Sequence, residues 1–297
     1  MEGQLSIQRD GEQLDTPAIG TEIQNFDLVT TGPDGAADIS VTTSRAPAMT
    51  VHVSADTQFT VELSVLAGKQ QTTVSIIGGS VSLKVAKLIS AQTVQVKTDS
   101  TSMGVRGTSF TVTAPPTGDV LVTCDEGDVL CTDDQGQELH ATPGVVVEKR
   151  PGELYRNTAV AVAGLGEYVR QWSADRSDSL QRNALRLITA NARLYATLSR
   201  ELSSARADLR RNDALLTKWK TENRQGRIGQ RAEVARERAV LGSLLARMRR
   251  AQFQLERVTY RLQRLRAIHD QCIGVGTLDG GVTTAQFFAR VDTERAG

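Results

Sequence analysis

The sequence predicts an α+β protein in which a β-rich half precedes a helical half. Short runs rich in valine, threonine and isoleucine recur every eight to twelve residues between glycines up to about residue 150, which is typical of all-β domains. All seven prolines lie at or before Pro151, and proline is poorly tolerated inside helices. From Asn157 onward alanine, leucine, arginine and glutamine dominate, and these residues favour helix.

Charge divides the chain at the same place. Up to Leu154 there are nine Lys/Arg and 20 Asp/Glu, a balance of −11; from Tyr155 there are 26 against 14, or +12, and the sum is the net charge of +1. A length of 297 residues is enough for about two domains. We therefore expect an all-β domain over 1–154, a helical domain over 155–273, and a flexible tail over 274–297 that contains a short helix near Thr283–Val291.

The β half is expected to form a sandwich or a short solenoid-like roll. Thr50–Ser54, Thr73–Ile76 and Val81–Val85 alternate apolar and polar residues, so each should bury one face, with Gly78-Gly79 as a turn between the last two. Val145–Val147 is a continuous apolar run, which favours a strand covered on both faces.

The helical half is expected to begin with a short helix over Asn157–Trp172. Ser177–Ser179 offers an N-cap for a long helix that reaches about Glu222. Apolar residues repeat every seven positions in that helix, and the pattern breaks over residues 223–230. The positions of the first seam are Ile188, Tyr195, Leu202, Leu209 and Leu216, with Ala184, Asn191, Leu198, Ala205, Asn212 and Trp219 beside them.

A second heptad pattern follows the break. Its positions are Val234, Leu241, Met248, Leu255 and Leu262, with Leu244, Ala251, Val258, Leu265 and Cys272 beside them. Two helices of similar length joined by a short turn should pair antiparallel, so we expect a coiled-coil hairpin. Asn191 and Asn212 are expected either in the seam, where they would set register, or on its solvated shoulder.

The most distinctive string of the chain is Gly104-Val105-Arg106-Gly107-Thr108, followed by Phe110. Its two glycines allow positive φ or close approach of another strand, and the alternation after Gly107 indicates a half-buried strand. The string resembles the G-V-R-G-T-x-F-x-V core of the FecR domain, named after the ferric citrate uptake regulator. Matching strands and turns, among them Glu126–Val129 and Thr142–Gly144, extend the resemblance over about residues 3–154.

That resemblance implies a β domain facing the periplasm. The chain opens directly on a strand pattern and has no apolar run long enough to span a membrane. We therefore expect a periplasmic or envelope-associated protein whose export signal has been removed; the alternative is a cytoplasmic protein that starts at Met1.

Arg106 has two interpretations. Its guanidinium could bind a phosphate or carboxylate through two parallel hydrogen bonds, or it could clamp backbone carbonyls or a buried carboxylate at the corner. We favour the structural interpretation.

Cys124 and Cys131 would face each other if Gly127-Asp128 were a two-residue hairpin loop, because facing residues would then sum to 255. The pair is either a cross-strand disulfide, which an oxidising compartment would favour, or two buried thiols. Cys272 has no partner in the sequence and is expected as a small apolar residue at a helix end.

Motifs of catalysis and metal binding are not found in the sequence. His52, His140 and His269 have no ligand spacing, and no zinc-protease, serine-hydrolase or phosphate-loop pattern occurs. An acidic group at Asp125, Glu126, Asp128, Asp133 and Asp134 lacks the order of a calcium loop. We expect no enzyme activity, no metal and no cofactor.

The helical half has 24 arginines and two lysines. The densest runs are Arg247, Arg249 and Arg250, and Arg261, Arg264 and Arg266. They form either a face for nucleic acid, anionic lipid or an acidic protein, or the ordinary charged exterior of a coiled coil. We also hypothesise that the basic rod docks on an acidic FecR-like surface, within the chain or on a second copy.

The leading functional hypothesis is a non-enzymatic envelope protein. The FecR-like domain would be a recognition platform, and the hairpin a spacer or an assembly element that forms homo-oligomers. Its partner would be another protein or envelope component rather than a small-molecule substrate. One alternative is a signalling component of iron-responsive regulation; another is an arginine-rich binder of nucleic acid or anionic surfaces.

Overall fold

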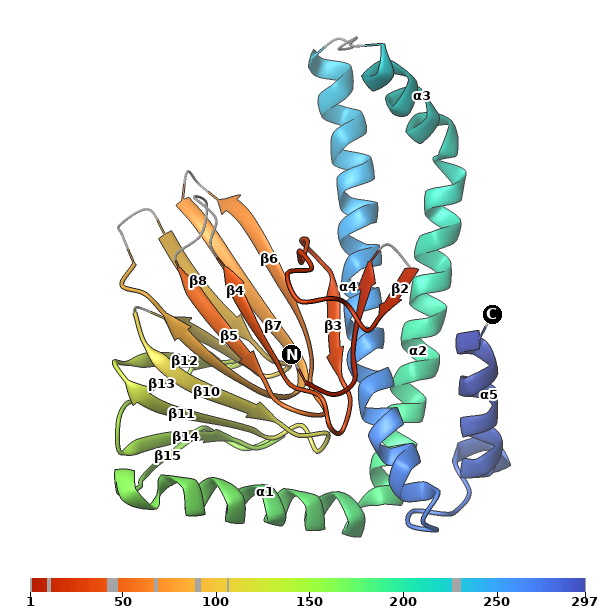
Figure 1. Ribbon diagram of the computed structural model, residues 1–297. Helices are drawn as coiled ribbons and strands as arrows, with labels where there is room; N and C mark the ends of the chain where they lie inside the picture. The colour runs from red at the N-terminus through yellow and green to blue at the C-terminus, as the bar shows by residue number, and fades with distance from the viewer. Residues whose placement is uncertain are drawn as a thin grey trace. The chain divides into compact units, whose positions relative to one another are not determined.

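A computed structural model describes residues 2–9, 12–41, 48–66, 69–88, 92–105, 107–225 and 231–296. The chain divides into two compact units, Met1–Asn183 and Ala184–Gly297. We call them the β unit and the helical unit. Strands occupy most of the first and helices the second, so the α+β class expected from the sequence is confirmed (Figure 1).

The β unit contains strands β1 to β15 and the helix α1. The strands are β1 (Leu5–Arg9), β2 (Glu12–Asp15), β3 (Leu28–Thr31), β4 (Ala37–Val41), β5 (Met49–Val53), β6 (Gln58–Leu66), β7 (Lys69–Val85), β8 (Gln92–Lys97), β9 (Thr101–Val105), β10 (Ser109–Ala114), β11 (Val120–Glu126), β12 (Val129–Asp133), β13 (Glu138–Ala141), β14 (Val145–Lys149) and β15 (Arg156–Ala159).

The strands form two sheets that share β7. One sheet has the order β13-β12-β9-β8-β7-β6-β3-β1-β2, and the other has β15-β14-β11-β10-β7-β5-β4. All pairings are antiparallel apart from that of β7 with β8. The first half of β7 pairs with β6 and the second half with β5 and β10, so β7 is the seam between the sheets.

Gly79 marks the place where β7 passes from one sheet to the other. Its φ is 94°, and a Cβ there would lie 2.3 Å from Oγ1 of Thr57. That same oxygen accepts a hydrogen bond from the backbone N–H of Ser80, at 2.9 Å. Only glycine fits such a corner. The turn expected at Gly78-Gly79 is therefore wrong: the glycines bend one continuous strand.

The core of the β unit lies between the two sheets. Alternate residues of β5, β9, β10 and β12 are buried in one apolar cluster, in agreement with the alternation in the sequence. β14 is covered on both faces as expected, because Val147 lies in this cluster whereas Val146 contacts Trp172 on the outer side.

The helix α1 (Leu165–Arg182) covers that outer side and belongs to the β unit. Trp172 packs against Leu121 and Val146, and Arg176 donates a hydrogen bond to the buried carboxylate of Asp119 at 2.9 Å. A 3-10 turn, Val162–Gly164, precedes α1.

These elements correct three expectations. The start of the expected lead-in helix is strand β15, and Ser177–Ser179 lies inside α1 rather than at an N-cap. The boundary between units falls after Asn183 rather than after Leu154, because β15 completes a sheet and α1 covers it.

The helical unit contains α2 (Ala184–Arg211), α3 (Asp213–Arg224), α4 (Arg231–His269), the 3-10 turn Asp279–Gly281 and α5 (Thr284–Ala296). The long helix expected up to Glu222 is broken at Asn212, whose side chain donates a hydrogen bond to the carbonyl of Asp208 at 2.9 Å. None of the helices in the described part of the chain combines the length and apolarity that crossing a bilayer needs.

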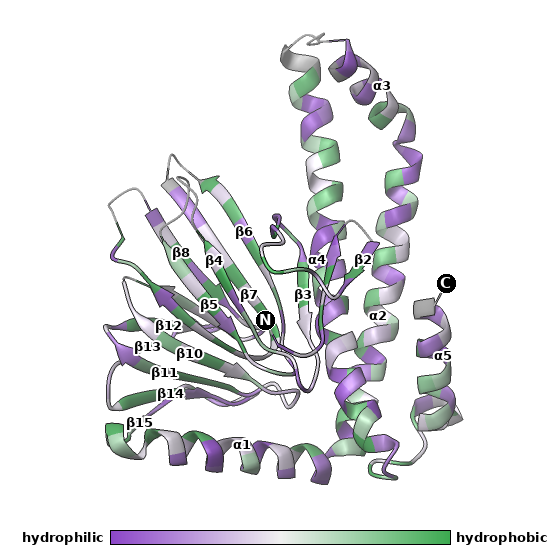
Figure 2. Cartoon of the chain, in the orientation of Figure 1, coloured by the Kyte–Doolittle hydropathy of each residue, from purple (hydrophilic) through white to green (hydrophobic). Residues whose placement is uncertain are grey.

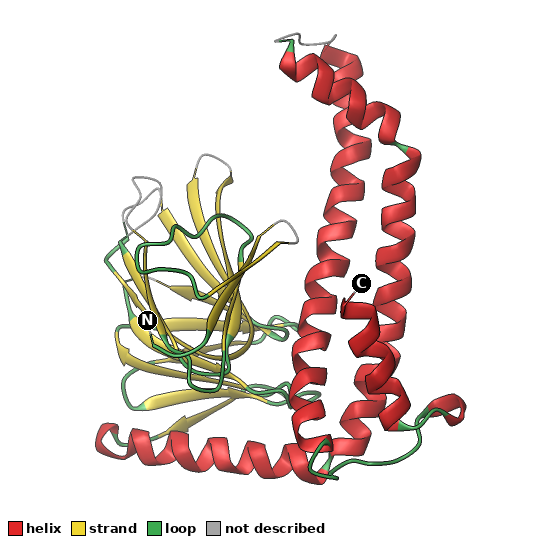
Figure 3. Ribbon diagram, turned by 45° about the vertical axis from the view of Figure 1, so that its right-hand side comes forward, coloured by secondary structure: helices red, strands yellow, loops and turns green. Residues whose placement is uncertain are grey.

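The helices α2 and α3 run antiparallel to α4 (Figure 3). Two ion pairs fix the register: Asp208 with Arg247, and Lys218 with Glu237. In both pairs the residue numbers sum to 455, as one constant antiparallel register requires; most of the break expected at 223–230 lies outside the described residues. Hydrophobic and hydrophilic residues alternate along both helices in Figure 2.

Burial along this pair changes with position. Ile188, Tyr195, Leu202 and Leu265 are buried, whereas Leu216, nearer the turn, is half-buried. We call the end of the pair that contacts α5 the base and the end beside the turn the tip. Asn191 is buried in the seam and donates to the carbonyl of Leu187, while Asn212 is half-buried.

The tail expected to be flexible is packed on the base. A Cβ at Gly274 would lie 2.7 Å from Cβ of Ala184. Thr283 and Gln286 each accept a hydrogen bond from the other's backbone N–H, a capping box that starts α5 close to the residue expected. Phe287, Phe288 and Val291 of α5 are buried. Cys272, expected as an apolar helix-end residue, is exposed with φ of 64°.

Candidate protein-interaction site

The string singled out in the sequence forms the corner between β9 and β10. Gly107 has φ of 66°, and a Cβ there would lie 2.9 Å from Cα of Lys87. Gly104, by contrast, lies inside β9 opposite Leu130, and nothing approaches its Cβ position within 4 Å. The backbone at Gly107 therefore requires glycine, whereas the backbone at Gly104 does not.

The residues that follow the corner are buried. The carbonyl of Thr108 accepts a hydrogen bond from the N–H of Val85 at 2.9 Å, and Phe110 has no exposed surface. Gly127 lies against the corner with φ of 90°, and a Cβ there would lie 2.6 Å from Cγ2 of Thr108. Arg106 lies outside the described residues, so both of its interpretations stay predictions.

Cys124 and Cys131 are both buried. The hairpin pairing that would place them opposite each other does not occur, because β11 pairs with β10 and β14 in one sheet whereas β12 pairs with β9 and β13 in the other. Burial raises the pKa of Cys124 to about 11 and that of Cys131 to about 12. The disulfide stays a prediction; the facing register on which it was based is wrong.

The acidic group expected in the sequence is dispersed by the fold. Asp133 is buried and accepts hydrogen bonds from Lys149 Nζ at 2.9 Å and from the backbone of Gln135 and Gln137. The hydrogen bond from Lys149 is the main reason that the pKa of Asp133 is lowered. Asp128 instead pairs with His140. Within the described ranges, no group of histidine, cysteine or acidic residues is arranged to hold a metal ion.

The arginines singled out on α4 do not share one environment. Arg247 pairs with Asp208, Arg264 lies over the ring of Tyr260, and Arg266 pairs with Asp270 and Asp292 and lies over Phe288. Arg249 and Arg250 are exposed, and Arg261 is half-buried. Arg247, Arg264 and Arg266 thus make contacts within the helical unit.

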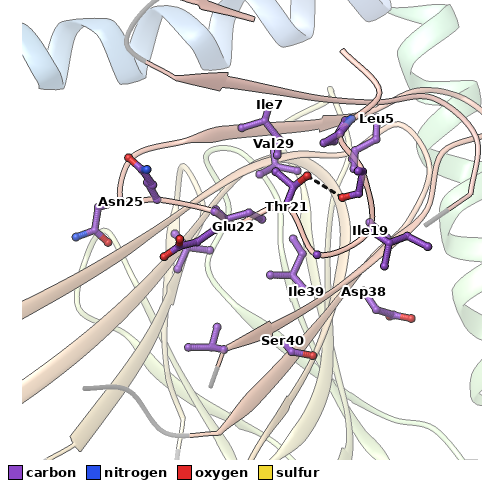
Figure 4. A pocket seen from close by; sticks show the side chains of 18 of the residues that line it. Leu5, Ile7, Ile19, Thr21, Glu22, Asn25, Val29, Asp38, Ile39 and Ser40 are labelled. Carbon is purple, nitrogen blue, oxygen red and sulfur yellow. Dashed lines mark hydrogen bonds between the residues drawn. The ribbon is translucent and has the colours of Figure 1, made fainter. Parts of the chain in front are cut away.

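The β unit has a cavity of about 590 Å³ that the sequence did not predict (Figure 4). It opens between the end of the first sheet and β4 of the second. Its walls are mainly aliphatic side chains: Leu5, Ile7, Ile23, Val29, Ile39, Val41, Val61 and Leu63. The exposed carboxylates of Glu22 and Asp38 stand at its rim. Its volume lies in the range of ligand and peptide pockets.

Residues 16–27, which join β2 to β3, form one wall of the cavity. The buried carboxylate of Asp27 holds this loop: it accepts hydrogen bonds from Arg9 Nε at 2.9 Å and from the backbone N–H of Gln24 at 2.8 Å. The side chain of Asn25 pairs with the backbone N–H and carbonyl of Leu63, as a neighbouring strand would. The wall is therefore fixed against β6 by Asn25 and at its end before β3 by Asp27.

The outer part of the same loop presents apolar surface. Ile19 is 87% exposed, beside a turn in which Thr21 donates two hydrogen bonds to the carbonyl of Ala18. A connection of this length without strand or helix is uncommon in a compact domain and is often functional. That length was the one signal in the sequence that pointed to the cavity.

Comparison with known proteins identifies part of the β unit. The model of one family, described as FecR protein, matches residues 27–130. No curated protein matches the chain significantly.

Two solved structures resemble part of the chain, and both are crystal structures of a candidate anti-sigma factor from Parabacteroides distasonis ATCC 8503, at 2.50 and 1.65 Å resolution. Each is 12% identical with a TM-score of 0.40 and covers 48% of this chain. This chain spans less than two thirds of their length, 63% and 64%.

The family match begins at Asp27, the last residue of the loop that walls the cavity, and ends inside β12. It includes β3 to β11 and the whole corner from Gly104 to Phe110. Residues 27–130 of this chain match the FecR family model, and the β unit extends beyond this match at both ends.

Proposed function

We propose that this chain is a non-enzymatic protein of the cell envelope in which the FecR domain is a recognition platform and the helical unit is a spacer or assembly element. The observation that carries the proposal is the FecR domain itself, at residues 27–130, because FecR proteins belong to envelope signalling and are regulatory rather than catalytic. The partner is accordingly another protein or envelope component.

The β unit supports a platform function through its surface. It has a cavity with an aliphatic lining and an acidic rim, and one wall of that cavity is held in place by the buried carboxylate of Asp27. The antiparallel pair of α2 and α4 is regular enough to act as a spacer, and we extend the proposal to a coiled coil that assembles copies of the chain.

A signalling role in iron-responsive regulation is the second candidate, and the FecR match favours it. The arginine-rich helices favour a nucleic-acid binder less, because Arg247 and Arg266 are engaged in ion pairs within the helical unit.

The test compares the source bacterium with a strain that lacks this chain. Protease accessibility in intact and osmotically opened cells reports the compartment, and we expect protection that is lost when the envelope is opened. Transcript profiling then separates the two candidates. A signalling component changes a small set of transcripts, restored by the wild-type chain, whereas a scaffold changes sensitivity to detergents with transcripts unaltered. Cleavage resistance that persists in opened envelopes would place the chain in the cytoplasm and contradict the proposal.

A further inference from the structure

The strand β4 has one paired edge and one open edge. On the paired side, Ala37, Ile39 and Val41 lie opposite Val53, Val51 and Met49 of β5. On the other side, Ala36, just before the strand, exchanges two backbone hydrogen bonds of 2.9 Å with Glu2. Beyond this bridge, no strand in the described part of the chain pairs with the open edge.

The bridge shows which backbone groups are left without a strand partner. Successive residues of a strand direct their N–H and C=O groups to opposite sides. Since Ala36 bonds outward to Glu2, Asp38 and Ser40 also direct their backbone groups outward, and the residues between them bond to β5. The same alternation is seen on β5, where Ser54 bonds to Ser80 of the next strand at 3.1 Å.

The cavity lies beside this open edge. Ala37, Ile39 and Val41 line it, with Ile39 seen among the lining side chains in Figure 4, whereas Asp38 and Ser40 are exposed. A strand added to the edge would have the same alternation. Its residues opposite Ile39 would enter the cavity, and those opposite Asp38 and Ser40 would face solvent.

We propose that the open edge of β4 binds an extended segment of a partner protein as an added antiparallel strand, with alternate aliphatic side chains in the cavity and basic side chains on the outer face. The proposal rests on the platform function above and names the chemistry of its partner. Main-chain hydrogen bonds provide affinity in this kind of recognition, and pockets for alternate side chains provide specificity.

Two observations decide the character of the segment. The direction follows from Glu2, which already pairs antiparallel with the position next to the edge. The charge follows from Glu22 and from Asp38, which also pairs with His52 of β5 at 2.7 Å, in a half of the chain that has 20 Asp/Glu against nine Lys/Arg. Opposite charges across neighbouring strands are favourable and like charges are not.

The test uses the full chain and a capped seven-residue peptide that alternates lysine and valine. Hydrogen exchange followed by mass spectrometry or NMR reads the backbone amides of Asp38 and Ser40. We expect saturating peptide to slow their exchange at least about tenfold, because each gains a main-chain partner. A peptide with glutamate in place of lysine should bind at least about tenfold more weakly. Unchanged exchange at millimolar peptide would overturn the proposal.

Substitutions at one position provide the matched control. Ser40→Pro removes an N–H that points to the open edge and leaves the bonds to β5 in place, whereas Ser40→Ala keeps that N–H. Peptide binding should be lost in the first variant and kept in the second. If Ser40→Pro does not fold, Asp38→Lys serves instead, and it should reverse the preference between the lysine and glutamate peptides. Equal binding to Ser40→Pro and Ser40→Ala contradicts strand addition.

Other occupants of the edge give different results. Sedimentation velocity that shows a dimer of the wild-type chain, lost in Ser40→Pro, identifies a second copy as the occupant and overturns the partner segment. A short alkyl ligand that saturates the cavity without protecting Asp38 and Ser40 identifies a small-molecule site and also overturns it. If no peptide binds but loss of the chain still changes transcripts, strand addition falls and the proposed function stands.

Discussion

The β unit and the helical unit bury their apolar side chains in different ways. In the β unit one cluster extends from Leu5 to Tyr155, and its members come from strands far apart in the sequence. In the helical unit burial is uneven along the pair: Ile188 and Leu265 at the base are fully buried, whereas nearer the tip Leu216 is half-buried and Leu241 is buried. We therefore expect the β unit to unfold as one cooperative block and the helical unit to open from its tip.

A third helix explains the gradient. At the base, α5 places Phe287 edge-on to Tyr195 with ring centroids 6.3 Å apart, and Tyr195 donates a hydrogen bond to Glu294 at 2.9 Å. Nearer the tip, α3 and α4 are joined by ion pairs such as that of Lys218 with Glu237. A helix pair alone covers only a narrow apolar seam, so a third helix is needed where the apolar stripe is wider.

The largest expected difference between the units is in thiol reactivity. Burial raises the pKa of Cys124 and Cys131 to about 11 and 12, so their thiolate fractions at pH 8 are very small, whereas Cys272 is exposed. Iodoacetamide at pH 8 should alkylate Cys272 at least about 100-fold faster than either β-unit cysteine, measured by peptide mass spectrometry. Denaturation in the absence of reductant should make both β-unit cysteines reactive toward iodoacetamide. Continued resistance after denaturation would indicate a Cys124–Cys131 disulfide.

Substitutions at the base and the tip measure the gradient in the helical unit. Phe288 is 1% exposed, so Phe288→Ala should lower the free energy of unfolding of this unit by about 3–5 kcal/mol. Leu216→Ala, at a half-buried position, should cost about 1 kcal/mol. Denaturant titration with unit-resolved hydrogen exchange separates the two. Equal losses of stability from both variants would show that burial is uniform along the pair. Faster amide exchange in the β unit of either variant would show that the two units unfold together.

The two glycines of the corner test the β unit at a single turn. Gly107→Ala places a Cβ 2.9 Å from Cα of Lys87 at a positive φ, and it should cost about 1–2 kcal/mol of stability. Gly104→Ala meets nothing within 4 Å in a strand and should change stability by less than about 0.5 kcal/mol. Thermal unfolding of the two variants beside the wild type makes the comparison. Equal effects would mean that the corner is not set by backbone conformation.

In both units the sequence predicts the features that local patterns decide and misses those that the pairing of distant segments decides. Local patterns decide the strand alternation of Val81–Val85 and the apolar stripe through Ile188, so both were predicted. Pairing of distant segments decides whether β11 joins β12, so the facing of Cys124 and Cys131 was not. The extended residues Arg156–Ala159 form a strand only because β14 offers an edge, and no local pattern shows that.

The cavity, too, depends on how segments distant in the sequence come together. It arises where Ile7, Ile39 and Leu63 from three separate strands fail to fill the space between the sheets. Neither a motif nor a periodicity reports such a gap. The length of the loop over residues 16–27 was the available hint, and the hydrogen bonds of Asp27 that fix its position appear only in the structure.

The smallest expected effect is the response of the tip to acid. The hydrogen bond from Lys218, followed by that from Trp219, lowers the pKa of Glu237, and hydrogen bonding to Arg247 is the main cause that lowers the pKa of Asp208. A carboxyl group whose pKa is lower in the folded state contributes stability above its unfolded pKa, and that contribution is lost as the pH falls through its folded pKa. The tip should therefore loosen below about pH 4, and the base should lose the contribution of Asp279, whose pKa the hydrogen bond from Arg193 lowers in the same way.

Trp219 reports this transition directly, because its indole N–H donates to Glu237 at 2.7 Å. In a Trp172→Phe background it is the one tryptophan of the chain, and its fluorescence should shift as the pH falls from 7 to 3. Both partners are partly exposed, so 1 M salt should weaken the shift. Glu237→Gln keeps an acceptor for the indole but does not titrate, and it should flatten the curve. An identical titration in that variant would assign the acid response to other carboxylates, and the tip would then owe its stability to its half-buried leucines rather than to its ion pairs.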